Sequence, residues 1–180
     1  MTRSGKIDFE SAAYFSDVED YILLVTVPDP DDPAATVQQN QNVGRVYLYG
    51  AETRLAVRFT DALTGGAGYT YTQWDNRSGT EKIIGIPAHK INAQIQFSPW
   101  KWLALSADGT HYAGLFSSSN GVRETRSFTV ANFKAAFVLR KGLKLETGIN
   151  NAFDENYEVE EGYPEEGVNY FANLTYAFRY

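Results

Sequence analysis

Tyr170-Phe171-Ala172-Asn173-Leu174-Thr175-Tyr176-Ala177-Phe178-Arg179-Tyr180 ends the chain and carries its clearest structural signal. Counting back by twos from Tyr180 gives apolar or aromatic residues throughout, whereas the alternate set is mostly small or polar. In a β-strand these two sets point to opposite faces. A soluble domain seldom ends on an uncovered aromatic strand, because a free strand edge invites aggregation. An outer-membrane β-barrel routinely ends this way, because its outward face meets lipid and its strand ends carry aromatic girdles.

The composition excludes several classes of protein. The formal net charge of -6 argues against nucleic-acid binding, and the absence of cysteine excludes disulfides and thiolate metal sites. The two histidines, His89 and His111, are far apart in sequence, so a histidine metal site has little support. No apolar run approaches the roughly 18 residues of a membrane helix. Membrane-spanning strands need only about 10 residues with every second one apolar, so they remain possible.

The rest of the chain predicts an all-β fold with eight long antiparallel strands in a meander. Strand one is expected over 6–25 with a bend near 16–17, and the chain from 27 to 42 is expected to be a loop, because its prolines and aspartates disfavour a ladder. The remaining strands are expected near 43–59, 63–74, 89–97, from 103, 128–139, 143–153 and 170–180. Short connections of about three or four residues alternate with long ones of about 12 to 17. This alternation is the pattern of short periplasmic turns and long extracellular loops.

One face of these strands is polar, and two interpretations fit it. In a soluble sandwich the polar face would meet solvent, and in a membrane barrel it would line a wet lumen. The loop lengths, the strand lengths and the aromatics near strand ends favour the barrel. Glu52, Arg54 and Arg58 are then expected to form a lumen salt-bridge ladder. The charged side chains predicted to face the lumen are Glu52, Arg54, Arg58, Lys90, Asp108, Lys134, Lys144 and Glu146.

No motif for catalysis stands out. There is no Ser/His/Asp set, P-loop or metal signature at useful spacing, so we expect neither an enzyme nor a bound cofactor or metal. One loop is rich in acidic residues: Asp154, Glu155, Glu158, Glu160, Glu161, Glu165 and Glu166. A solvated loop is one interpretation of this segment, and a site for a cation or metal complex is the other.

Several stretches resemble TonB-dependent outer-membrane receptors. Residues 148–157, GINNAFDENY, resemble a segment of the family's penultimate strand, and the matching positions are Asn150, Asn151, Phe153, Asp154 and Tyr157. Residues 162–178 resemble the family's ending, and residues 42–52 and 69–90 resemble two earlier stretches, in the family's order. Val168 and Asn169 depart from the pattern, because they stand where the family commonly has an arginine.

The resemblance implies that residues 1–180 are the C-terminal portion of such a receptor's barrel in the outer membrane of a Gram-negative bacterium. The resemblance further implies the family's architecture, a 22-stranded barrel with an N-terminal plug. It also implies the family's activity, which is import of iron-siderophore or similar complexes with energy delivered through TonB. We expect no plug, TonB-contacting segment or export signal in this chain, and therefore no transport by the chain alone.

Two arrangements remain open from the sequence. The eight strands are either the last third of the large barrel or a closed eight-stranded barrel with a structural or loop-mediated binding role. A soluble β-barrel that binds a small ligand is a third and weaker interpretation. In both membrane arrangements the expected partners are outer-membrane lipid and the barrel-assembly machinery. The family's terminal aromatic strand is expected to be the assembly signal, here Tyr176, Phe178 and Tyr180.

Overall fold

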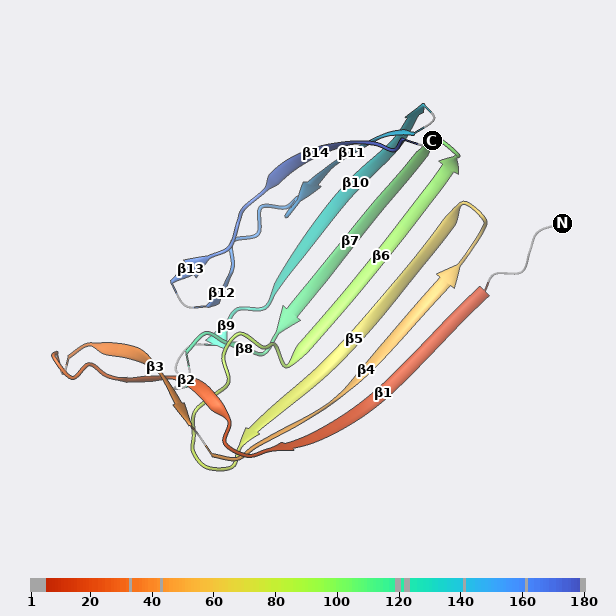
Figure 1. Cartoon of the computed structure of the whole chain (residues 1–180). Coiled ribbons are helices and arrows are strands. Elements are labelled where there is room, and N and C mark those ends of the chain that lie inside the picture. Colours follow the sequence, from red (N-terminus) through yellow and green to blue (C-terminus); the bar gives the residue numbers. More distant parts are fainter. Residues whose placement is uncertain are drawn as a thin grey trace.

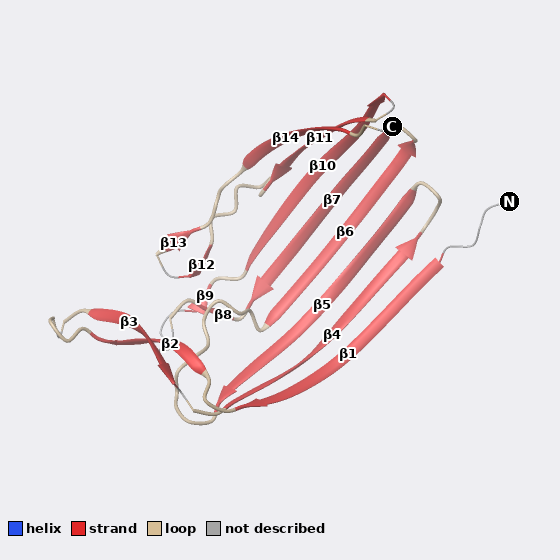
Figure 2. Ribbon diagram, in the orientation of Figure 1, coloured by secondary structure: helices blue, strands red, loops and turns tan. Residues whose placement is uncertain are grey.

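The computed structural model describes residues 6–32, 34–42, 44–118, 121, 124–140, 142–160 and 162–178. Every regular element in these ranges is a β-strand (Figure 2). None of the described segments forms a helix that is long and apolar enough to cross a bilayer. The predicted all-β class is therefore confirmed.

Eight strands form one antiparallel sheet in the order β1-β4-β5-β6-β7-β10-β11-β14, so the large sheet is a meander (Figure 1). Its strands are β1 (Lys6–Val18), β4 (Val46–Arg58), β5 (Leu63–Asn76), β6 (His89–Trp100), β7 (Leu103–Ala113), β10 (Phe128–Arg140), β11 (Leu143–Asn150) and β14 (Asn169–Tyr176). Among the described strands, β1 and β14 each have a single neighbour, and no pairing joins them. The sheet is thus open at both edges, and the closed eight-stranded barrel is not what these strands form.

Three small hairpins lie together at one end of the sheet, and the tight turns β4–β5, β6–β7 and β10–β11 lie at the other (Figure 1). The hairpins pair β2 (Ile22–Pro28) with β3 (Thr36–Asn42), β8 (Leu115–Phe116) with β9 (Glu124–Thr125), and β12 (Glu158–Glu160) with β13 (Tyr163–Pro164). We call these the hairpin end and the turn end of the sheet. The predicted alternation of short and long connections is therefore present, and β1 begins and β14 ends at the turn end (Figure 1).

The first connection corrects the sequence prediction. Strand β1 ends at Val18, and Asp20, with a φ of 56°, turns the chain into a separate hairpin. The ladder of that hairpin reaches from Ile22 opposite Asn42 to Pro28 opposite Thr36, so it accommodates Pro28 at its end. Its base is held by a small apolar core in which Leu23, Val25, Val46 and Ile83 are buried. The predicted 27–42 loop was wrong because this local core stabilises a hairpin that the turn-forming residues alone disfavour.

Cross-strand pairing shows which residues share a face of the sheet. Glu10 lies opposite Arg54, Arg58 opposite Thr64, and Asp108 opposite Asn132, so the polar residues of successive strands are aligned. On this face a hollow of about 440 Å³ is lined by side chains from β1 to β10, including Lys6, Gln94 and Lys134. We call it the concave face. The opposite, outward face carries the apolar set, with Ile7, Ile95 and Phe133 between 44% and 66% exposed.

Two aromatic side chains lie across glycines on the concave face. Phe171 covers Gly148, where a Cβ atom would come within 2.6 Å of the Phe171 ring. Tyr14 crosses Gly50 in the same way, and its hydroxyl is 3.0 Å from Thr72 Oγ1 on the next strand. Both glycines are needed because any side chain there would occupy the space of the aromatic ring. Each ring thus ties the outermost strand of the sheet, β14 or β1, to the interior strands.

Candidate functional site

The concave face holds most of the charged residues predicted from the sequence, but it does not pair them as expected. Within the described ranges Glu52, Arg54 and Arg58 form no ion pair with one another or with any other residue, so the predicted salt-bridge ladder is wrong. Arg58 lines the hollow on the concave face, whereas Glu52 and Arg54 line a second hollow on the same face. The wall therefore presents uncompensated charge to whatever occupies the concave side.

The other predicted charged residues have individual partners. Lys90 places its ammonium 5.7 Å from the ring centroid of Tyr112, which is a cation–π distance. Lys144 lies 3.8 Å from Glu146 on the same strand. Asp108 Oδ2 accepts a hydrogen bond of 2.8 Å from Asn132 Nδ2, and Lys134 lines the hollow. The cross-strand register puts these charged residues on one face of the sheet, whereas their individual partners depend on neighbours that alternation cannot identify.

Asn151 is the centre of a hydrogen-bond network at the hairpin end. It is only 3% exposed, and its backbone φ is 46°. Its Nδ2 donates to the carbonyls of Glu155 at 2.8 Å and Glu166 at 3.1 Å, and its Oδ1 accepts from the Glu155 amide at 2.9 Å. Asparagine tolerates a positive φ better than most residues, so this position needs both its backbone freedom and its amide.

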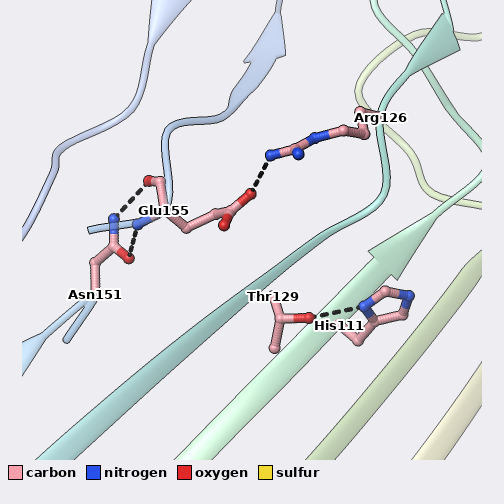
Figure 3. A network of polar contacts seen from close by, with 5 residues as sticks. All are labelled: His111, Arg126, Thr129, Asn151 and Glu155. Carbon is pink, nitrogen blue, oxygen red and sulfur yellow. Dashed lines mark hydrogen bonds and ion pairs between the residues drawn. The ribbon is translucent and has the colours of Figure 1, made fainter. Parts of the chain in front are cut away.

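The network continues in both directions from Asn151. Its backbone amide donates to Asn132 Oδ1 at 3.0 Å, and Asn132 in turn binds Asp108 on the wall. On the other side, the Glu155 carboxylate accepts a hydrogen bond of 2.7 Å from Arg126 Nη2 (Figure 3). A continuous chain of contacts thus connects the concave wall to the long connection between β11 and β14. Alternation assigns Asn132 to the polar face, but nothing in it distinguishes Asn132 or Arg126 from other polar residues.

The remaining family-motif residues shape the same connection. Asp154 also has a positive φ of 51°, and its Oδ1 accepts from the Val168 amide at 2.9 Å, which closes the loop onto β14. Asn150 donates to Asn169 Oδ1 at 2.8 Å across the β11–β14 pair. Phe153 is 72% exposed and meets Phe133 edge to face, with ring centroids 6.3 Å apart. These contacts give the motif a structural role in the turn.

Tyr157 packs the connection between β11 and β14 against aromatic side chains of β10 and β7. Its ring stacks on Phe128 with centroids 4.3 Å apart, and Phe128 stacks on Tyr112 at 5.0 Å. Burial, together with the nearby Glu165 carboxylate, raises the pKa of the Tyr157 phenol above its ordinary 10.0. A pocket of about 390 Å³ lies beside the stack, between β7, β10 and three hairpin-end segments. We call it the aromatic pocket, and its lining residues are Gly85, Pro87, Thr110, Tyr112, Leu115, Phe128, Val130, Asn132, Tyr157, Val159 and Glu165.

The aromatic pocket was not predicted from the sequence. Tyr112 and Phe128 lie in register on β7 and β10, so pairing these two strands would have revealed them. The acidic loop was predicted, and its residues now have separate roles, with Glu155 bound to Arg126 and Glu165 lining the pocket. Glu161 lies outside the described residues. In the part of the chain that the structure describes, no three His, Asp or Glu side chains gather closely enough to hold a metal ion.

The C-terminal aromatics lie at the turn end of the sheet. Tyr176 and Phe178 meet edge to face with centroids 4.5 Å apart, and Phe178 is 75% exposed. Tyr180 lies outside the described residues. At the same end Trp100 and Trp102 stack in parallel at 5.2 Å, and both are at least half exposed. Large exposed aromatics at a strand end are typical of a membrane interface.

Comparisons with known proteins agree with this architecture. Residues 2–152 match the family model described as TonB dependent receptor-like, beta-barrel. An iron-regulated outer membrane virulence protein of Vibrio cholerae serotype O1 is 26% identical over 92% of this chain, which corresponds to 28% of that protein. The chain thus spans less than a third of the length of this relative.

Solved structures share the fold at low sequence identity. The copper transporter OprC superposes with a TM-score of 0.78 and 18% identity, over 96% of this chain and 29% of that one. The siderophore receptor PirA from Acinetobacter baumannii superposes with a TM-score of 0.74 and 16% identity, over 96% of this chain and 30% of that one. A ferric enterobactin receptor (PfeA) mutant from Pseudomonas aeruginosa superposes with a TM-score of 0.70 and 20% identity, over 94% of this chain and 29% of that one. The strand meander, the outward aromatics and these matches have one explanation: the chain belongs to the TonB-dependent receptor family, a family of receptors and transporters in the Gram-negative outer membrane, and it is a segment of the family's β-barrel.

Proposed function

We propose that this chain is the C-terminal part of the barrel of a receptor that imports an iron-siderophore or similar metal complex. The observation that carries the proposal is the open sheet: a family barrel segment whose two edge strands each lack a second neighbour needs further strands to close a pore. The iron-regulated Vibrio relative favours an iron complex as the cargo. Because its sheet is open, this segment alone does not transport the metal complex.

In the assembled receptor the concave face would line the lumen and the outward face would meet lipid. The uncompensated Glu52, Arg54 and Arg58 would then be available to a plug domain inside the barrel. The hairpin end would be extracellular, so the aromatic pocket would lie in the entrance through which the complex arrives. The exposed aromatics at the turn end would lie at the periplasmic interface, where Tyr176, Phe178 and Tyr180 would be recognised by the barrel-assembly machinery. TonB would act on the plug, outside this chain.

Uptake by cells tests this function. The full-length receptor is expressed in a Gram-negative host that lacks its own siderophore receptors, and radioactive iron uptake is measured for hydroxamate, catecholate and carboxylate complexes. We expect uptake of one class, which disappears in a host without TonB. Residues 1–180 expressed alone behind an export signal are the matched control and should give none. Uptake by the segment alone, or TonB-independent uptake by the whole receptor, would contradict the proposal.

A further inference from the structure

The two histidines of the chain, 22 positions apart, become near neighbours on the outward face. His89 lies on β6 opposite Ala113, and His111 lies on β7 opposite Ile91. They are therefore diagonal neighbours on adjacent strands, and residues so related are roughly 7–8 Å apart, within reach of long side chains. Sequence separation had argued against a histidine site, and the strand pairing removes that objection.

Each imidazole is held through the same ring nitrogen by a hydroxyl on the strand that lies away from the other histidine. Nδ1 of His89 is 2.8 Å from the Tyr69 hydroxyl on β5. Nδ1 of His111 is 2.9 Å from Thr129 Oγ1 on β10 (Figure 3). Because the two nitrogens of an imidazole point in different directions, the Nε2 atom of each ring faces away from the hydroxyl that holds Nδ1.

This arrangement is the one that metal-binding histidines adopt. A histidine ligand generally donates its second ring N–H to an oxygen, which fixes the tautomer and the ring orientation. Here Tyr69 and Thr129 offer such an oxygen to each ring, and neither Nε2 has a hydrogen-bond partner among the described contacts. The His89 ring also packs against Tyr71, with centroids 5.3 Å apart, which restrains it further.

The surroundings suit a cation. The outward residues that neighbour the pair on β5, β6, β7 and β10 include no lysine or arginine, so no fixed positive charge opposes a metal ion there. All four strands lie inside the sheet, so the pair is complete without strands from elsewhere in the barrel. The outward face is also the side away from the lumen, so the pair is separate from the aromatic pocket.

We propose that His89 and His111 bind one divalent transition-metal ion through their Nε2 atoms. Tyr69 and Tyr71 lie beside His89 near the hairpin end, as aromatics do at the border of the lipid-facing band, and there the ion's other coordination positions are open to water. Two imidazole nitrogens suit Cu²⁺, Ni²⁺ or Zn²⁺ and do not suit Mg²⁺ or Ca²⁺, which prefer oxygen ligands. The site lies on the outer wall near the hairpin end and is distinct from any cargo that the receptor imports. It does not depend on the proposed uptake function.

Copper binding to the full-length receptor in detergent provides the test, with Cu²⁺ as the probe. We expect the electron paramagnetic resonance spectrum of the wild-type receptor to show one ion with two imidazole nitrogens. His89→Asn and His111→Asn should each lower the affinity for that ion by at least about tenfold, because one imidazole cannot chelate. The double variant should lower it about as much as each single variant does. Tyr69→Phe and Thr129→Val should weaken it less, and Ser11→Ala, elsewhere on the outward face, should leave it unchanged.

Three outcomes would overturn the proposal. The signal could persist in the double variant, it could be absent from the wild-type receptor, or the single variants could each lose half of it, as two independent histidines would. Chemical modification of the wild-type receptor gives an answer without any variant. Diethyl pyrocarbonate labelling, read by mass spectrometry, should be suppressed at both histidines together when Zn²⁺ is added, and unequal or absent protection would contradict a shared ion.

Discussion

At the scale of single residues, the family-motif side chains act through the backbone. Asn151 and Asp154 both adopt a positive φ, and their side chains satisfy amides and carbonyls of the β11–β14 connection. The motif was visible in the sequence as a string of letters. Its physical content, a buried amide that closes a long loop, required the positions of Asn132, Glu155 and Glu166.

Asn151→Ala should loosen the 151–168 connection more than any other single truncation in it. The change removes one acceptor and two donated hydrogen bonds at a buried position, and we expect a cost of about 3 kcal/mol. Limited proteolysis of the receptor in detergent would report the loss as faster cleavage within this connection. Asn151→Gly is the matched comparison, since it keeps the positive φ and lacks the amide. Equal protection in the alanine variant and the wild type would contradict the role of the amide.

Tyr157 provides a prediction about pH. Its pKa is raised above 10.0 in the folded protein, so the neutral phenol is the form that the docked loop favours. That contribution to stability is complete below pH 10.0, the ordinary value, and is lost as the pH rises through it toward the folded pKa. The tyrosinate absorbance of the wild type minus that of Tyr157→Phe should titrate with a midpoint above 10.0. A midpoint at or below the ordinary value would show that the ring is not held against Phe128.

At the scale of elements, alternation predicted most of the large sheet. The strands after β1 were expected within a few residues of their observed bounds, because a two-residue period continues wherever one face is apolar and the other polar. It failed at residues 22–42, where Leu23 and Val25 bury against Val46 and Ile83 and stabilise a hairpin apart from the sheet. It also failed for Glu52, Arg54 and Arg58, since a period of two assigns a face and not a partner.

Gly148→Ala tests how β14 is attached. The new Cβ would meet the Phe171 ring at 2.6 Å and the Phe133 carbonyl at 2.5 Å, so the β14 strand must shift. We expect a loss on the order of 1–3 kcal/mol, as for other overpacked positions. The readout is a lower temperature for the loss of heat-modifiable migration on gels. Gly109→Ala is the control, because its nearest neighbour would be a carbonyl at 3.6 Å. Equal effects of the two changes would contradict the argument.

At the scale of the whole molecule, the open sheet decides what the chain can do. Strands β1 and β14 each present a second edge of backbone donors and acceptors that must be satisfied before the sheet can span a membrane. Residues 1–180 refolded alone into detergent should therefore give oligomers and aggregates, whereas the full-length receptor should give a heat-modifiable monomer. Size-exclusion chromatography with light scattering distinguishes these states. A monodisperse, heat-modifiable monomer of the isolated segment would mean that the two edges close on each other.

The three tryptophans, finally, make the chain its own optical probe. The ring planes of Trp100 and Trp102 are parallel within 1°, and their centroids lie 5.2 Å apart at the turn end. Trp74 lies at the other end of the sheet, packed against the hairpin core and 5.6 Å from Tyr21. Brominated lipids would quench the exposed pair and spare Trp74. Insertion of the turn end and docking of the β2–β3 hairpin would thus appear as two separate spectroscopic events, with no label attached.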